Sequence, residues 1–210
     1  MSVAYQDKQI KGISVRATGS AKINIVESPS DEVHIILNND GGQLSISEDN
    51  MILSIRAHPH GKFASPEDRE KDCDLTIMVP DDDQLLWVIG AVDDARITCN
   101  MPSLTALFIC KENGIIQASH VKGEILIDSG GRGQIELLSQ SGDVTPSFIA
   151  EDNSKIIARN ISLQNGTVTT KNNATAMLGA CQNVDFEKHG HGTITVSNEN
   201  MLPGTSPFFT

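Results

Sequence analysis

Two pairs of histidines are the first residues in this 210-residue sequence that could do chemistry. A single proline separates His58 from His60, and a single glycine separates His189 from His191. Two imidazoles supply at most half of the coordination sphere of zinc, and no third ligand is identifiable near either pair. We therefore expect solvated histidines and assign no metal and no cofactor. Two further histidines stand alone and are expected on strand surfaces: His34 and His120.

Carboxylates are the second group. Glycoside hydrolysis needs two carboxyl groups roughly 5 to 9.5 Å apart, and the candidates are Asp128, Glu136 and Asp143, which lie on predicted strands. No nucleophile elbow, P-loop or HExxH motif is present. With one Trp, one Tyr and six Phe, few rings are available to stack on a sugar. We expect no enzymatic activity and assign no catalytic residue, and a carbohydrate-active enzyme is the less favoured alternative.

Acidic residues also occur in predicted turns, where they could bind Ca²⁺, which prefers roughly six to eight oxygen ligands. These residues are Asp93, Asp94, Glu112, Glu151 and Asp152. The segment 130–135 has the glycines of the calcium-binding nonapeptide repeat, but Ile135 stands where a ligand aspartate is required. The pattern therefore favours solvated turn residues over calcium ligands.

Charge and cysteine spacing limit the partners. The 27 acidic residues exceed the 16 Lys and Arg residues, and a net charge of −11 repels nucleic acid and anionic lipid. The four cysteines show no CxxC spacing and are expected as buried thiols: Cys73, Cys99, Cys110 and Cys181. The sequence shows no signal-peptide run at its start and no stretch of about 18 apolar residues. It predicts no nucleic-acid partner, no membrane insertion and, as written, a cytoplasmic location.

The residues from Ile13 to Val79 alternate between apolar and polar with a period of two, which is typical of strands that bury one face. Turn residues such as Gly19-Ser20 separate these runs. The pattern predicts an antiparallel meander with strands at 13–18, 21–27, 32–38, 43–47 and 51–57, and a sixth strand at 73–79. The loop from His58 to Asp72 has no strand pattern, and long loops of this kind are often functional.

The second half of the sequence contains a repeat. Two series of apolar residues each recur about every 20 residues and flank polar turns, which should lie one above another. The first series is Ile89, Ile109, Ile127, Phe148, Val168 and Phe186; the second is Ile97, Ile116, Ile135, Ile156, Met177 and Ile194. Short strand pairs cannot bury their apolar faces alone, but stacked units can. The sequence therefore predicts an all-β fold in which the antiparallel strand meander leads into a β-helix or β-solenoid-like stack of about six short rungs.

One domain is expected over residues 1–210, with the meander at 10–80, the repeat stack at 85–197 and a tail or cap at 198–210. Three segments resemble the family called putative auto-transporter adhesin head, or GIN, domains: ISVRATGSAKINI (13–25), GGQLSI (41–46) and LTIMVP (75–80). In such domains a strand meander leads through a Val-Pro step into a stack of Ser- and Gly-rich strands. The resemblance implies export to the cell envelope, although this sequence starts without a leader peptide or lipoprotein cysteine.

The sequence and the resemblance together favour a non-enzymatic binding module, adhesin-like or associated with the cell envelope. Its partner would be a protein or a glycan, and formation of homo-oligomers stays open. The alternative from another class is a cytoplasmic scaffold that assembles by end-to-end stacking. If a site exists, we expect it at the stacked turns or in the loop from His58 to Asp72.

Overall fold

The computed structural model describes residues 2–5, 10–38, 42–59, 73–82 and 84–197, and this part of the chain is all-β without a helix. Its eighteen strands form one curled, mixed sheet. No helix in these segments is long and apolar enough to cross a membrane. The strands are β1 (Ser2–Tyr5), β2 (Gly12–Ala17), β3 (Lys22–Glu27), β4 (Val33–Leu37), β5 (Gly42–Asp49), β6 (Ile52–Pro59), β7 (Asp74–Val79), β8 (Leu86–Ala91), β9 (Arg96–Leu104), β10 (Ala106–Cys110), β11 (Ile115–Ser129), β12 (Gln134–Leu137), β13 (Gln140–Ala150), β14 (Lys155–Ala158), β15 (Leu163–Asn172), β16 (Thr175–Leu178), β17 (Cys181–Gly190) and β18 (Thr193–Val196).

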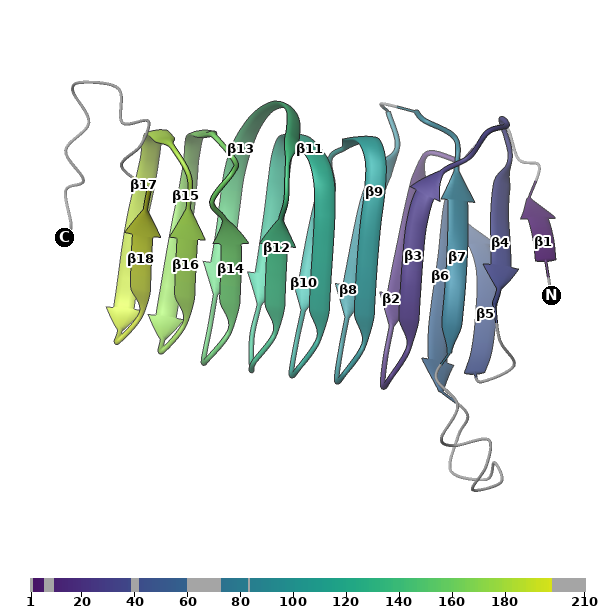
Figure 1. The fold of residues 1–210 in the computed structure, drawn as a ribbon, viewed down its shortest axis with the longest axis horizontal. Coiled ribbons are helices and arrows are strands. Elements are labelled where there is room, and N and C mark those ends of the chain that lie inside the picture. Colours follow the sequence, from purple (N-terminus) through teal and green to yellow (C-terminus); the bar gives the residue numbers. More distant parts are fainter. Residues whose placement is uncertain (1, 6–9, 39–41, 60–72, 83, 198–210) are drawn as a thin grey trace.

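The curled sheet places its strands in two layers that run along the long axis of the molecule (Figure 1). Layer A contains, in order of pairing, β5, β6, β2, β8, β10, residues 124–129 of β11, β13, β15 and β17. Layer B contains β1, β4, β7, β3, β9, residues 115–119 of β11, β12, β14, β16 and β18. From β6 to β17 and from β7 to β18, every pairing is parallel. From β6 onward the chain alternates between the layers, so consecutive strands lie in opposite layers.

Side chains between the layers form one continuous cluster of buried hydrophobic residues. Phe108 and Phe148 are among the largest of them. The pairing register corrects two members of the predicted series. Ile89 and Ile127 lie beside Phe108, which is buried, whereas Ile109 faces outward. Because the side-chain period of a strand is two, a register error of one residue turns a core position into a surface one.

The second correction concerns β16. Ile156 and Ile194 lie beside Ala176, which is fully buried, and the predicted residue Met177 points outward. Both errors arose where two adjacent residues are apolar, because spacing alone cannot decide which of them is buried. The other members of both series lie in register as predicted.

The predicted antiparallel meander is confirmed for the hairpin of β5 and β6 but is wrong for β2 and β3, although its strand positions are close to those observed. β2 pairs in parallel with β6 and β8, and β3 pairs in parallel with β7 and β9. Antiparallel pairing is confined to β1–β4, β4–β7 and β5–β6 in the described residues. The turn at Gly19, with φ 62°, carries the chain from one layer to the other instead of forming a hairpin within one sheet.

β2 and β3 therefore lie inside the layers, although they come early in the sequence. The β2–β3 unit lies between the β6–β7 unit and the β8–β9 unit, and the connection from β7 to β8 crosses over it (Figure 1). Thr18 N–H donates to the carbonyl of Ala57 on one side, and Val92 N–H donates to the carbonyl of Ala17 on the other. The turn between β2 and β3 thus forms backbone hydrogen bonds with the neighbouring units on both sides.

Candidate functional site

The polar turns between layers A and B lie in register, as predicted. Arg132 N–H donates to the carbonyl of Glu112, Asn153 N–H to that of Gly131, and Asn173 N–H to that of Asp152, at 2.6 to 2.8 Å. The residues at the equivalent left-handed position of successive turns have φ values between 54° and 74°: Glu112, Gly131, Asp152, Asn172 and Gly190. Glycine, asparagine and aspartate tolerate this conformation best, which explains their recurrence in the turns.

Most carboxylates of this turn column bind nitrogen donors of neighbouring turns. Asp152 accepts from Gly131 N–H at 3.2 Å and from Asn172 Nδ2 at 3.0 Å, and Asp94 accepts from Asn113 Nδ2 at 3.1 Å. Glu151 forms an ion pair with Lys171 at 2.7 Å, which raises the pKa of that lysine. These contacts connect neighbouring turns of the column. In the described residues, no three His, Cys, Asp or Glu side chains are grouped as metal ligands.

The three carboxylates considered for glycoside hydrolysis are kept apart. Asp128 lies on the outer face of layer A and pairs with Lys111 at 2.5 Å, whereas Glu136 lies on the outer face of layer B and accepts from Gln117 at 2.8 Å. Asp143 is exposed in β13 and accepts from Gln164 at 3.3 Å. Asp128 and Glu136 therefore do not share a cleft.

The histidines of the described residues lie on the surface of the protein or are half-buried. His189 and His191 are exposed, and the His189 ring lies 3.8 Å from Glu187. His34 is half-buried and hydrogen-bonds to Ser30, and His120 is exposed. His58 lies in β6, but His60 and the rest of the loop to Asp72 lie outside the described residues, as does the segment 198–210.

The four cysteines are free thiols, and all but Cys181 are buried. Burial raises the pKa of Cys99 and of Cys181 to about 12 and that of Cys110 to about 11. Burial, followed by the charge of Asp74, also raises the pKa of Cys73. Reactive thiols need the opposite shift, so these cysteines are packing residues, as expected from their apolar surroundings.

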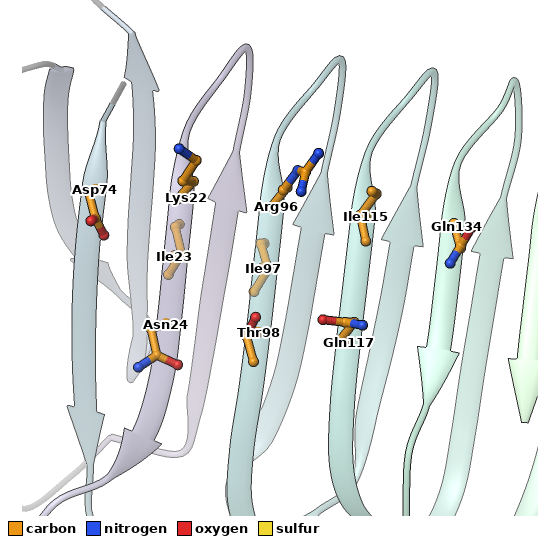
Figure 2. Close-up of a pocket in the computed structure, with 10 residues that line it drawn as sticks. All are labelled: Lys22, Ile23, Asn24, Asp74, Arg96, Ile97, Thr98, Ile115, Gln117 and Gln134. Carbon is orange, nitrogen blue, oxygen red and sulfur yellow. The ribbon is translucent and has the colours of Figure 1, made fainter. Parts of the chain in front are cut away.

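A hollow of about 450 Å³ lies on the outer face of layer B, over β7, β3, β9, β11 and β12 (Figure 2). Its side chains come from cross-strand rows. Asp74, Lys22, Arg96, Ile115 and Gln134 follow one another in register across the five strands. Two residues further along the strands, a second row contains Asn24, Thr98 and Gln117. Parallel pairing at every step therefore collects residues from five separate sequence segments.

A second hollow of about 390 Å³ adjoins the first and shares Gln134 with it. We call the two hollows together the polar face. Lys155 and Arg159 are exposed on it, and Arg159 donates to the Met177 sulfur at 2.9 Å. The polar face carries four cations (Lys22, Arg96, Lys155 and Arg159) and two carboxylates (Asp74 and Glu136). It is thus locally positive on a chain of net charge −11.

Sequence reasoning did not identify the polar face. Its cations are isolated in the sequence, so they do not form a basic run that composition could reveal. The available signal was the constant spacing of the repeat. Once a period near 20 residues is known, outward residues such as Arg96, Ile115 and Gln134 can be placed side by side by counting from Ile97, Ile116 and Ile135.

No family model matches this sequence, and no curated protein sequence matches it. Solved structures with the same fold do exist. The chain is similar to a "putative adhesin" from Bacteroides fragilis at 14% identity and a TM-score of 0.61, with 94% of this chain and 96% of that one covered. A "putative adhesin" from Parabacteroides distasonis gives 12% identity and 0.56, and a "putative lipid binding protein" from the same organism 12% and 0.51; both cover 94% of this chain and 96% of their own.

At these identities the likeness concerns the fold, and it extends over nearly the whole chain. The three structures come from bacteria, and two of them are named for adhesion. The chain therefore shares an all-β fold, over nearly its full length, with bacterial proteins that are named as adhesins.

Proposed function

We propose that this protein is a non-enzymatic, adhesin-like binding module of the cell envelope, and that it binds its ligand through the polar face. The observation that carries the proposal is the pair of adjoining hollows. They present guanidinium, ammonium, amide and hydroxyl groups in regular rows on a sheet. Binding sites built on paired strands hold their side chains in fixed positions, which lowers the entropy lost on binding.

We infer that the two layers form a β-solenoid. The parallel pairings repeat from β6 to β17 and from β7 to β18, and the turns between the layers bond to one another. Six strand pairs come from the predicted repeat, and the β2–β3 and β6–β7 units extend the same arrangement. Such a column gives an elongated surface whose rows of side chains are about 4.8 Å apart.

The chemistry of the polar face favours an acidic glycan as the ligand. Arginine binds carboxylate and sulfate groups through paired hydrogen bonds, and amide side chains bind hydroxyl groups in both donor and acceptor roles. Arg96 is exposed and makes no ion pair or side-chain hydrogen bond with the described residues. An extended acidic peptide is the protein ligand that would satisfy the same groups.

Binding to an array of acidic and neutral glycans tests the proposal, with Arg96→Ala as the test variant and Arg132→Ala as its control. Arg132 is also exposed but lies in the turn column. We expect Arg96→Ala to weaken binding to acidic glycans at least about tenfold, within the range of hot-spot arginines. Arg132→Ala should leave binding unchanged. Equal effects of the two substitutions, or no binding to any glycan or acidic peptide, would contradict the proposal.

Location is tested separately by adding protease to intact cells that make the protein and probing with an antibody. Cleavage of the native protein supports an exposed envelope location. Complete protection, with cleavage after lysis, would instead favour the cytoplasmic scaffold. That scaffold would stack through β17 and β18, each of which pairs with one strand only in the described residues.

A further inference from the structure

The outer face of layer A differs in character from the polar face. Seven large hydrophobic side chains are exposed in the described residues, and five of them lie on this face: Ile52, Leu86, Val88, Leu126 and Ile149. Val88, Leu107 and Leu126 are direct cross-strand neighbours. Ile109 and Ile149 flank Asp128 in the next row. The apolar side chains thus form one contiguous area, which we call the apolar face.

Contiguous apolar areas of a few hundred Å² on a protein surface mark interaction sites, whereas single exposed hydrophobic residues do not. On the apolar face the residues are clustered, and they occur on five strands, from β6 to β13. Asp128 carries a charge in this area, and it is paired with Lys111 at 2.5 Å. A partner that covers this area must offer apolar surface in return.

The charges at the two ends of layer A are opposite. Arg16 and Arg56 lie directly opposite each other on β2 and β6, both exposed. Like charges in this position are unfavourable, and neither guanidinium forms an ion pair with a carboxylate in the described part of the chain. At the other end, β17 presents Asp185 and Glu187, both exposed.

These two ends are related by the order of the strands. Eight strands of layer A follow one another in the order β6, β2, β8, β10, β11, β13, β15 and β17. A two-fold axis can lie in front of this face, parallel to the strands and midway between β10 and β11. It places β6 of one copy over β17 of the other. The same axis places β8 over β13 and β10 over β11. Arg56 shares its row with Glu187, because the register runs through Arg16, Gly90, Ile109, Asp128, Ile149 and Thr169.

We propose that the apolar face binds a second copy of this chain in a face-to-face dimer with this two-fold axis. In the dimer, Leu107 of one copy faces Leu126 of the other, and Ile149 faces Gly90, beside Val88. At both ends, Arg56 faces Glu187 of the other copy, with Arg16 on the adjacent strand. A symmetric interface requires such self-complementarity of one surface, and this face has it in both its apolar centre and its charged ends.

Two further carboxylates lie on β11. Asp128 faces Ile109 of the other copy and is paired with Lys111 of its own copy, and Glu124 lies in the acidic half of the face. Asp49 lies opposite Ile52 at the β5 edge, outside the row of the two arginines.

The size of the face predicts a weak dimer. Eight strands at ~4.8 Å and about five residues of ~3.3 Å each give roughly 630 Å² per copy. Specific interfaces of standard size bury about 800 Å² per partner. We therefore expect dissociation constants in the micromolar range, with dimer at high protein concentration and monomer at low concentration.

Sedimentation equilibrium over a hundredfold range of concentration tests the dimer, with Leu126→Asp as the test variant and Leu138→Asp as its matched control. Each leucine is 38% exposed, so neither aspartate needs to enter the core, but Leu138 lines the second hollow on layer B. We expect Leu126→Asp to weaken dimerisation at least about tenfold, since the change occurs twice in a symmetric interface. Leu138→Asp should dimerise like the unmodified protein.

Charge reversal tests the orientation independently. Arg56→Glu and Glu187→Arg should each weaken the dimer, and the double variant should restore it, because each copy then offers the exchanged charges. A protein that stays monomeric at the highest concentration would overturn the proposal. So would a dimer that Leu126→Asp does not weaken, or a double variant that is no better than the single ones.

Binding to vesicles of neutral and anionic phospholipid tests the remaining alternative, in which lipid covers the apolar face. Binding of the monomer to vesicles, lost in Leu126→Asp but kept in Leu138→Asp, would show that the face is covered by lipid and would overturn the dimer. None of these measurements depends on ligand binding at the polar face, so failure of the dimer leaves the ligand-binding proposal standing, and the reverse also holds.

Discussion

Asp152 and Asn172 occupy the same left-handed position in neighbouring turns, and Asn172 Nδ2 donates to Asp152 Oδ1 at 3.0 Å. The other carboxylate oxygen of Asp152 accepts from Gly131 N–H at 3.2 Å in the turn on the opposite side. One side chain therefore links three turns. Such contacts align the column of turns and, with it, the rows of side chains on both outer faces.

Replacing Asp152 by alanine should destabilise the fold by about 1 to 2 kcal/mol, because both charge-assisted hydrogen bonds are lost. Asp93→Ala is the control, since Asp93 has the same left-handed backbone, with φ 60°, and no side-chain hydrogen bond in the described residues. Urea unfolding measures both. If the two variants lose the same stability, the cost is that of the backbone conformation and the inter-turn bonds contribute nothing.

Gly166→Ala should be strongly destabilising, by about 3 kcal/mol or more, since it forces the backbone to move. A Cβ at this position would lie 2.0 Å from the carbonyl oxygen of Pro146, which belongs to the neighbouring strand. Gly90→Ala is the matched control because its nearest neighbour would be 3.8 Å away. Thermal unfolding of both variants at low protein concentration checks the difference. A similar melting temperature for the two would show that β15 and β13 are not packed as described.

The register of β10 predicts opposite outcomes for two adjacent residues. Phe108→Ala should cost about 3 to 5 kcal/mol because Phe108 is fully buried between the layers. Ile109→Ala should cost less than about 1 kcal/mol, since that side chain points outward. Chemical unfolding of the two variants distinguishes the observed register from the predicted one, in which Ile109 is the core residue.

Alkaline pH should weaken the fold through its buried thiols. Burial raises the pKa of Cys99 to about 12, whereas a thiol in the unfolded chain titrates near ~8.5. A raised pKa in the folded state gives stability that is fully present below the unfolded value and is lost as pH rises toward the folded one. Between pH 9 and 11, stability should fall by about 1 kcal/mol per pH unit for each such thiol.

Cys99→Ala isolates this effect, because it removes one titrating group and should flatten the dependence of unfolding free energy on pH in this window. Ile97→Val, which also removes buried volume but no thiol, should run parallel to the unmodified protein. Urea unfolding at several pH values from 8 to 11 gives the slope of unfolding free energy against pH for each protein. Identical slopes for all three proteins would mean that Cys99 does not stay buried and neutral.

The sequence by itself determined that the protein is built of short strands, where most of them lie, and that its second half repeats. Apolar and polar residues such as Ile13, Ser14 and Val15 alternate with the period of a strand, and this local property does not depend on the partners of the strand. The recurrence of polar turns at a constant spacing likewise predicted that the turns would align. A repeat constrains spacing, so these features are readable along the chain.

Only the tertiary structure decided which strands are neighbours and which side chains share a surface. Alternation in β2 fits an antiparallel hairpin and a parallel neighbour equally well, and placing β2 between β6 and β8 requires contacts with residues 40 and more positions away. Arg56 and Glu187 share a row, and Lys22 lies beside Arg96, for the same reason. Both outer faces depend on pairings between distant segments, and no local pattern in the sequence encodes them.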